Sequence, residues 1–208
     1  HVSIANAQDS VTLGKIDVSA GHDVTLSATQ STINVTQPIK LTDAGSLDLS
    51  AENGLNIQAP MMTDGGDISL QANRIDIAAE LRGLGGELRM RPWHVDGTVP
   101  VVLGEAELAN TTTFHLDQAE IDYLANGFSR IVIGDPNARM DIQIGDPARS
   151  GSAITVKDPL LIQNPVLGGH IRSYAQLVGL DDATLEIDGS GETIDIYDRW
   201  DPDTAGHP

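Results

Sequence analysis

The stretch LDLSAENGLNIQAP, residues 47–60, decides the fold, because ISLQANRIDIAAE, residues 68–80, repeats its pattern. The aligned apolar pairs are Leu47 with Ile68, Leu49 with Leu70, Ala51 with Ala72 and, after a slip of one residue, Leu55 with Ile75 and Ile57 with Ile77. An earlier copy of the same pattern begins at Val24. Self-similarity at a fixed period of this length is typical of a repeat architecture.

Within each copy, apolar and polar residues alternate with a period of two, which predicts short strands with one buried face. One copy cannot bury its own apolar face, but copies stacked about 4.8 Å apart can. Glycines at 45, 66 and 86 separate the copies, 21 and then 20 residues apart. A β-sandwich also alternates between turns, but it does not require register from copy to copy. We therefore predict an all-β parallel β-helix, or β-solenoid, with coils of roughly 20 residues.

The chain divides into three parts that we expect to form one continuous domain. Residues 1–92 carry the regular coils, 93–130 form an irregular insertion, and 131–208 continue the solenoid more loosely. In the last part the pattern IxIGDP occurs at Ile131 and again at Ile142. Proline lacks the backbone donor that a strand needs, so Asp-Pro after each short strand predicts a turn.

The insertion contains the one good helix signal, FHLDQAEIDYLANGF from Phe114. Asp117 is a suitable N-cap, and Glu120 stands three residues later, which is the spacing of a capping box. Gly127 is placed to end the helix. The insertion is therefore expected to hold a short helix.

Charge and composition exclude several classes of function. The chain has 30 acidic and 12 basic residues, a net charge of −18, which would repel a nucleic-acid backbone or an anionic membrane surface. Aromatic residues make up only 3%, so the core should be aliphatic and thin. Cysteine is absent, which removes disulfides, thiol catalysis and thiolate metal sites.

Few residues suggest a binding site. Trp93 and Tyr123 could stack on a sugar ring, although aromatic residues here also suit a cover over an open edge of the core. Residues 181–208 hold nine carboxylates, and oxygen-rich turns of this kind can bind calcium. The weak calcium candidates are Asp188, Asp195 and Asp198, and a solvated acidic surface is the simpler explanation of these residues.

A β-helix can also carry carbohydrate-active enzymes, whose catalytic carboxylates converge on one outward face. The outward columns expected here read Thr25, Asp48, Ser69, Arg89 and Ser27, Ser50, Gln71, Arg91. They supply one carboxylate rather than a pair. The six histidines form no HxH or HxxxH pair, so a transition-metal site is not expected. We therefore expect no catalytic residues, no cofactor and no enzyme activity.

The stacked copies with their Gly-Gly turns resemble the β-helical shafts of filamentous-haemagglutinin-type adhesins, the giant exoproteins of bacterial two-partner secretion. AEIDYLANGFSRIVIGD, from Ala119, and ITVKDPLLIQNP, from Ile154, resemble a block that recurs in such surface proteins. The resemblance implies a right-handed parallel β-helix, export across the outer membrane and an adhesive or structural role. The family's N-terminal secretion domain is not recognisable here, since Asn164-Pro165 alone does not supply its asparagine-proline motifs.

The expected function is thus that of a non-catalytic structural or adhesive segment of a secreted bacterial surface exoprotein. Its expected partners are a glycan or protein on a host or neighbouring cell, or its own copies end to end, with no nucleic acid and no membrane insertion. Two alternatives stay open: a subunit of a self-assembling extracellular filament, and a carbohydrate-active β-helix enzyme.

Strand-like sequence runs to both ends of the chain without a recognisable polar cap, and unpaired strand edges favour pairing with another chain. We predict that the chain associates lengthwise, and more strongly at high salt or with divalent cations, which screen the charge of −18. Sedimentation across a salt and calcium series measures this. A monomer under every condition would contradict the prediction.

Overall fold

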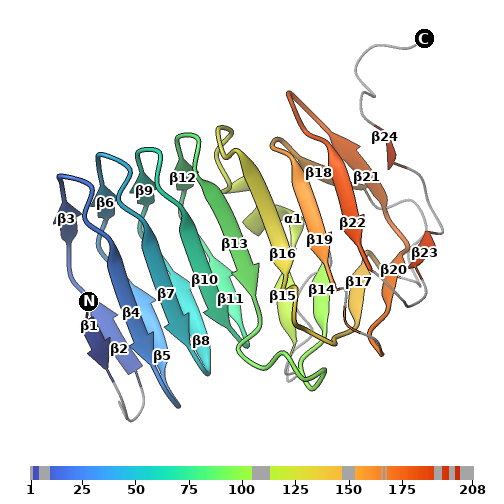
Figure 1. Ribbon diagram of the computed structural model, residues 1–208, viewed down its shortest axis with the longest axis horizontal. Coiled ribbons are helices and arrows are strands. Elements are labelled where there is room, and N and C mark those ends of the chain that lie inside the picture. The colour runs from blue at the N-terminus through green and yellow to red at the C-terminus, as the bar shows by residue number, and fades with distance from the viewer. Residues whose placement is uncertain are drawn as a thin grey trace.

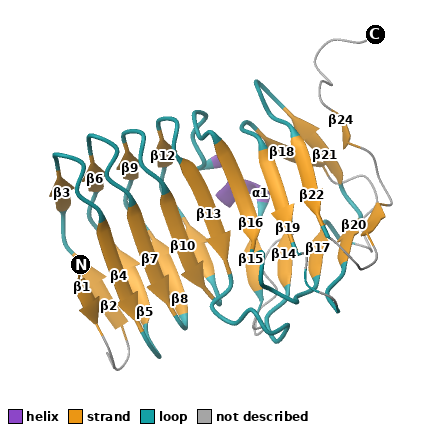
Figure 2. Ribbon diagram, viewed as in Figure 1, coloured by secondary structure: helices purple, strands orange, loops and turns teal. Residues whose placement is uncertain are grey.

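The computed structural model of the chain describes residues 2–4, 10–104, 113–146, 153–164, 166, 168–189, 194–196 and 200–201. These residues form an all-β parallel solenoid of about seven turns with one short helix (Figures 1 and 2). Every strand ladder in the described part of the chain is parallel. The predicted fold class, a parallel β-solenoid, is confirmed.

The longest sheet, sheet A, contributes one strand to each coil and runs along the near face in Figure 1. In spatial order its strands are β1 (Val2–Ile4), β4 (Val24–Ala28), β7 (Leu47–Ala51), β10 (Ile68–Ala72), β13 (Glu87–Arg91), β16 (Arg130–Gly134), β19 (Leu160–Gln163) and β22 (Leu185–Asp188). This order is also the order along the chain, so sheet A passes without a break from the regular coils to the looser ones.

Two four-stranded sheets complete the regular coils. Sheet B consists of β2 (Ser10–Leu13), β5 (Thr32–Val35), β8 (Gly54–Ile57) and β11 (Ile75–Ile77). Sheet C consists of β3 (Ile16–Val18), β6 (Ile39–Leu41), β9 (Met61–Thr63) and β12 (Leu81–Gly83). Each regular coil therefore has three short strands, one in each sheet.

The later coils use two other sheets beside sheet A. Sheet D has the spatial order β15 (Phe114–Leu116), β14 (Val101–Leu103), β17 (Ile142–Ile144), β20 (Ile171–Ser173) and β23 (Ile194–Ile196). Sheet E consists of β18 (Ala153–Val156), β21 (Gln176–Gly179) and β24 (Trp200–Asp201). The strands that precede the Asp-Pro turns, β16, β17 and β18, thus fall in three different sheets.

The register predicted from the repeats is confirmed residue by residue. Leu47 pairs with Ile68 and Leu49 with Leu70 in sheet A. In sheet B, Leu55 pairs with Ile75 and Ile57 with Ile77, so the one-residue slip between the copies falls in the bend between the two sheets. The inward residues consequently stack as columns along the solenoid axis.

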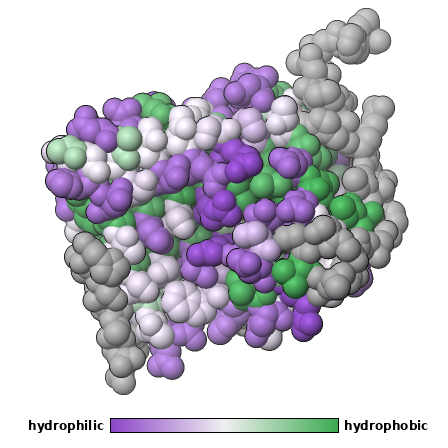
Figure 3. All heavy atoms as spheres, in the orientation of Figure 1, coloured by the Kyte–Doolittle hydropathy of each residue, from purple (hydrophilic) through white to green (hydrophobic). Residues whose placement is uncertain are grey.

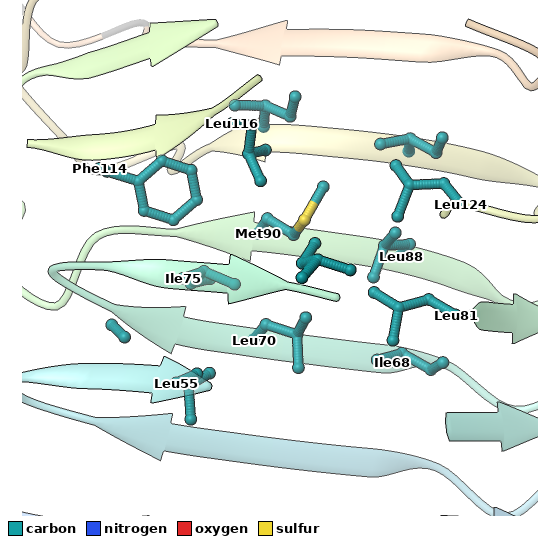
Figure 4. Packing of buried hydrophobic residues seen from close by; sticks show 14 of the residues in the cluster. Leu55, Ile68, Leu70, Ile75, Leu81, Leu88, Met90, Phe114, Leu116 and Leu124 are labelled. Atoms are coloured by element: carbon teal, nitrogen blue, oxygen red, sulfur yellow. The ribbon is translucent and has the colours of Figure 1, made fainter. Parts of the chain in front are cut away.

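These columns form a continuous aliphatic core. In Figure 4, Leu70 and Met90 of sheet A face Ile75 and Phe114 across the interior, while Leu81 and Leu124 close it from the third side. The buried side chains in these columns have at most a few per cent of their surface exposed. Removing this apolar area from water is the main contribution to the stability of the fold.

Glycine occupies the turns before β10 and β13 for a steric reason. A Cβ on Gly66 would lie 2.1 Å from the carbonyl oxygen of Gly45, and a Cβ on Gly86 would lie 2.0 Å from that of Gly66. Both contacts are far below a van der Waals distance and involve backbone atoms that cannot rotate away. Successive coils therefore approach each other at the glycines more closely than any side chain permits.

In one coil the order along the axis differs from the order along the chain. The chain passes from β13 to β14, and then turns back to place β15 between β11 and β14. The helix α1 (Gln118–Asp122) follows β15 and lies behind β16 in Figure 1. The insertion predicted at 93–130 therefore contains two strands of sheet D as well as the helix.

The predicted helix is present but shorter than its sequence pattern indicates. Phe114–Leu116 is a strand, and α1 ends at Asp122 rather than continuing to Gly127. The reason is that Leu124 forms a parallel bridge with Leu81, which extends sheet C by one position. Pairing in the sheet thus overrides the helical propensity of residues 123–126.

The outer surface of sheet A is mostly hydrophilic with apolar residues between the polar ones, as Figure 3 shows for the near face. Among the described residues, no helix is long and apolar enough to span a membrane.

The stacked turn glycines Gly45, Gly66 and Gly86 provide a test of the spacing between coils. We expect Gly66→Ala to destabilise the protein by about 2 kcal/mol or more, as overpacking against rigid atoms does. Gly14→Ala is the matched control, since a Cβ there meets nothing within 4 Å, and we expect it to be neutral or slightly stabilising. Thermal unfolding followed by circular dichroism compares the two variants. Equal melting temperatures would show that the turns are not closely packed.

Candidate functional site

The candidate site lies at the seam between the regular coils and the insertion. β11 is the last strand of sheet B, and β15 lies next to it as the first strand of sheet D. No ladder joins these two strands in the part of the chain that the structure describes. Instead, the backbone N–H of Ile77 donates a hydrogen bond to Oε1 of Glu120, at 3.0 Å. A side chain of the insertion thus takes the place of the next strand.

Glu120 reaches this position because it belongs to the capping box of α1. Asp117, with φ of −85° and ψ of 174°, is the N-cap, and its Oδ1 accepts the N–H of Glu120 at 2.9 Å. In return, Oε2 of Glu120 accepts the N–H of Asp117 at 2.9 Å. The predicted capping box is confirmed, and its glutamate also binds a neighbouring coil.

The seam borders a half-open pocket of about 270 Å³. Its lining residues, the seam pocket from here on, are Asp76, Ile77, Ala78, His115, Asp117, Ala119 and Glu120. They come from the end of β11, from β15 and from the first turn of α1. Three of these residues are acidic and one is a histidine, so titratable side chains from three elements meet in one small space.

The electrostatics of the seam pocket centre on Glu120. Burial raises the pKa of this carboxyl from its ordinary value of 4.5 to about 7. The hydrogen bonds from the Asp117 and Ile77 amides oppose the rise, and the negative charges of Asp117 and Asp76 add to it. Nδ1 of His115, whose side chain is 9% exposed, lies 3.7 Å from Oε2 of Glu120.

The seam pocket has the elements of acid–base chemistry. A carboxyl that titrates near neutrality can give or accept a proton at physiological pH. Asp76 is 40% exposed and is held by Arg74, whose Nη2 lies 3.1 Å from Asp76 Oδ1. Acidic and basic groups therefore converge in the seam pocket, whereas the sequence analysis looked for such groups only in the outward columns of sheet A.

Metal binding is a different matter. Among the residues that the structure describes, no group of three His, Asp or Glu side chains is placed to hold a metal ion. Of the calcium candidates, Asp188 accepts a hydrogen bond from Nε2 of Gln163 at 3.3 Å through its Oδ2. Asp198 and the side chain of Asp195 lie outside the described residues, so the calcium site at these three residues stays a prediction.

The two aromatic candidates lie on different elements. Trp93 is half-buried and follows β13, whereas Tyr123 is 42% exposed and forms the C-cap of α1. The other aromatic residues of the insertion, Phe114 and Phe128, are 0% and 2% exposed and belong to the core. A glycan contact through Trp93 or Tyr123 stays a prediction.

The outward columns of sheet A lie in the predicted register, with Asp48 beside Ser69 and Ser69 beside Arg89. The arginines there are paired: Glu87 accepts hydrogen bonds from Arg89 and Arg130, each at 2.7 Å. Burial acts to raise the pKa of Glu87, but these hydrogen bonds outweigh it and hold the pKa below its ordinary value. The charges on this face therefore neutralise one another.

Arg91 is paired in a similar way, with the buried carboxylate of Asp135. Asp48, in the same outward layer, is only half-exposed; burial raises its pKa, and the charge of Arg91 partly offsets the rise. These side chains hold neighbouring strands together rather than converging on a common point.

The sequence analysis identified Asp117 and Glu120 as capping residues but not as parts of a pocket. Asp76 and His115 gave no separate signal, because each occupies the central position of a three-residue strand. The pairing of Ile77 with Glu120 spans 43 residues, and no repeat links the two segments. Only a placement of β15 beside β11 would have revealed the pocket.

A pair of substitutions tests the structural role of the seam. Glu120→Ala leaves the N–H groups of Ile77 and Asp117 without their acceptor, so we expect a loss of about 1–3 kcal/mol in the free energy of unfolding. Asp122→Ala, on the exposed side of the same helix, should change it by less than about 0.5 kcal/mol. Urea titrations of both variants measure the difference. Equal stabilities would mean that the seam is held by other contacts.

Comparison with known proteins adds no family to this description. No family model matches the chain, and no curated protein or solved structure matches it either.

Proposed function

We propose that this chain is a non-catalytic structural and adhesive segment of a secreted bacterial surface exoprotein of the filamentous-haemagglutinin type. The observation that carries the proposal is the continuous ladder of sheet A, in which eight parallel strands stack without a break. A stack of this kind is quasi-one-dimensional, so it suits a rigid spacer that presents an extended surface. The repeat texture that resembles such shafts agrees with this role.

The outward residues of the regular coils support a structural and contact role. On sheet B, Nδ2 of Asn56 donates a hydrogen bond to Oδ1 of Asn34 at 2.7 Å, from one coil to the next. Such side-chain ladders stabilise stacked strands. The same stacking repeats short polar groups at the spacing of the coils, about 4.8 Å, which provides a regular surface for a long partner.

The proposed partners are a glycan or protein on a host or neighbouring cell, or further copies of the chain. The charge of −18 argues for a neutral or cationic partner surface rather than a polyanion. Trp93 and Tyr123 are the proposed glycan contacts, since aromatic rings with partly exposed faces suit sugar stacking. Secretion to the cell surface belongs to the same proposal and follows from the resemblance.

A second candidate function, a carbohydrate-active β-helix enzyme, is favoured by one observation, the seam pocket. There a carboxyl with a pKa of about 7 is accompanied by two further carboxylates, Asp76 and Asp117. One protonated and one ionised carboxyl are the usual requirement for glycoside hydrolysis. Against this candidate, both oxygens of Glu120 already accept backbone hydrogen bonds that hold the seam together.

An activity screen separates the two candidates. The purified chain is incubated with pectic, alginate and glycosaminoglycan substrates, and new reducing ends or unsaturated products are measured. We expect no turnover. Turnover that is lost in Glu120→Gln and retained in Asp122→Asn would establish the enzyme and overturn the proposal. Binding of the chain to immobilised neutral glycans and to cell surfaces, weakened by Trp93→Ala or Tyr123→Ala, would support the adhesive role.

A further inference from the structure

A short turn in the looser coils lies between two longer turns at the edge where the chain enters sheet A, the upper edge in Figure 1. Residues 157–159 join β18 to β19, whereas residues 180–184 join β21 to β22 and residues 125–129 lead into β16. Parallel pairing fixes this order, since β19 lies between β16 and β22, and β18 lies beside β21. The turn at 157–159 therefore has a turn of the neighbouring coil on each side.

Asp158, in the middle of the short turn, is a buried residue with one carboxylate oxygen unused. It is 1% exposed. Its Oδ1 accepts the N–H of Gly127, from the preceding coil, at 2.9 Å. Its Oδ2 is buried and has no hydrogen-bond partner among the described residues. Because the two oxygens of a carboxylate point apart, Oδ2 faces away from Gly127 and toward the next coil.

The next coil places two further carboxylates near Asp158. Burial raises the pKa of the Asp158 carboxyl, hydrogen bonds from backbone amides oppose the rise, and the negative charges of Asp182 and Asp181 add to it. Nδ2 of Asn126 donates a hydrogen bond to Oδ2 of Asp181 at 3.0 Å. This bond runs from the turn before Asp158 to the turn after it, so the two longer turns meet beside the short one.

The negative charge at these turns is not balanced as it is elsewhere in the protein. Asp135, the other buried aspartate of the described residues, is paired with Arg91. In the part of the chain that the structure describes, no lysine or arginine forms an ion pair with Asp158, Asp181 or Asp182. A buried charge is normally paired with an opposite charge or coordinates a metal ion. A cation is therefore the ligand that this arrangement favours.

We propose that Asp158, Asp181 and Asp182 form a calcium site that joins successive coils, with Oδ2 of Asp158 as its buried ligand. The proposal does not depend on the adhesive function, because it follows from the contacts of three turns of the solenoid. It also concerns different residues from the calcium candidates that the sequence suggested.

The chemistry of the site selects calcium among cations. An organic cation is too large to reach Oδ2 of Asp158, because this oxygen is buried. Ligands that are all oxygen atoms suit calcium or magnesium rather than a transition metal. Magnesium requires near-ideal octahedral geometry and retains several waters, whereas calcium accepts irregular sets of roughly six to eight oxygens. Carboxylates on turns of unequal length form an irregular set.

Binding requires a rearrangement of exposed side chains only. As the side chains are placed, no three carboxylates among the described residues stand close enough to hold a metal ion. Asp181 and Asp182 are exposed, so their side chains can rotate onto an ion, whereas Asp158 is held in place by Gly127. Asp181 then exchanges its bond to Asn126 for the ion. Backbone carbonyls and water complete the coordination.

A calcium titration of the intact chain, first freed of metal with a chelator, tests the site. Backbone amides are followed by NMR. We expect saturable shifts confined to Gly127, Asp158 and residues 180–184, with a dissociation constant of about 10⁻³ M or below. Magnesium at the same concentrations is the control, and we expect it to bind at least tenfold more weakly. Equal responses to the two ions, or shifts spread over the acidic surface, would indicate general screening of the charge of −18 and overturn the proposal.

Three variants locate the site, with calcium binding measured by titration calorimetry. Asp158→Asn keeps an oxygen for the N–H of Gly127 but removes the buried charge, so we expect the affinity to fall tenfold or more. Asp181→Asn combined with Asp182→Asn should have the same effect, and it keeps the test valid if Asp158→Asn does not fold, because both residues are exposed. Asp188→Asn is the matched control, and its affinity should stay within twofold of the wild type.

The outcomes separate clearly. Wild-type affinity in Asp158→Asn or in the double variant would overturn the proposal. So would a loss of binding in Asp188→Asn, or the absence of saturable binding by the wild-type chain. None of these results would affect the adhesive proposal, which is tested with glycans and cell surfaces.

Discussion

The whole structure depends on the hydrogen-bonded stacking of one coil on the next. A single coil of three short strands has an apolar side but nothing to cover its top and bottom, so it has no core of its own. The parallel ladders of sheets A, B and C provide both the backbone pairing and the contact between inward columns. The close approach at Gly45, Gly66 and Gly86 shows how little space this stacking leaves between the turns.

The regular coils could be predicted from the sequence because their information is local and repeated. Leu47, Ile68 and Leu88 occur at the same point of successive copies, and alternation with period two identifies the face that each presents. The start of the helix is also predictable, because its capping box is a local signal. The end of the helix is not, because it depends on the bridge between Leu124 and Leu81, which no local pattern indicates.

The site was less predictable than the fold for the same physical reason. Glu120 caps its own helix and also accepts the N–H of Ile77, and only the capping role can be predicted from the neighbouring residues. Its bond to Ile77 depends on where β15 lies, and β15 is out of sequence along the axis. His115 and Asp76 look like the middle residues of ordinary strands until the two strands meet. Residues that close a break in a repeat are therefore the ones that repeat analysis does not detect.

The reversed order of β14 and β15 also has a consequence for how the chain assembles. Elsewhere in the described ladders, each strand can add to a neighbour that precedes it in the chain, so growth along the axis can follow synthesis. At this one coil, β14 is made first but belongs farther out, and the space beside β11 stays open until β15 arrives. Phe114 of β15 is then fully buried, on a strand that pairs with β14 on one side and contacts β11 on the other. Folding of the solenoid thus cannot follow the chain order strictly at this coil, because β14 must pass over the position beside β11 before β15 occupies it.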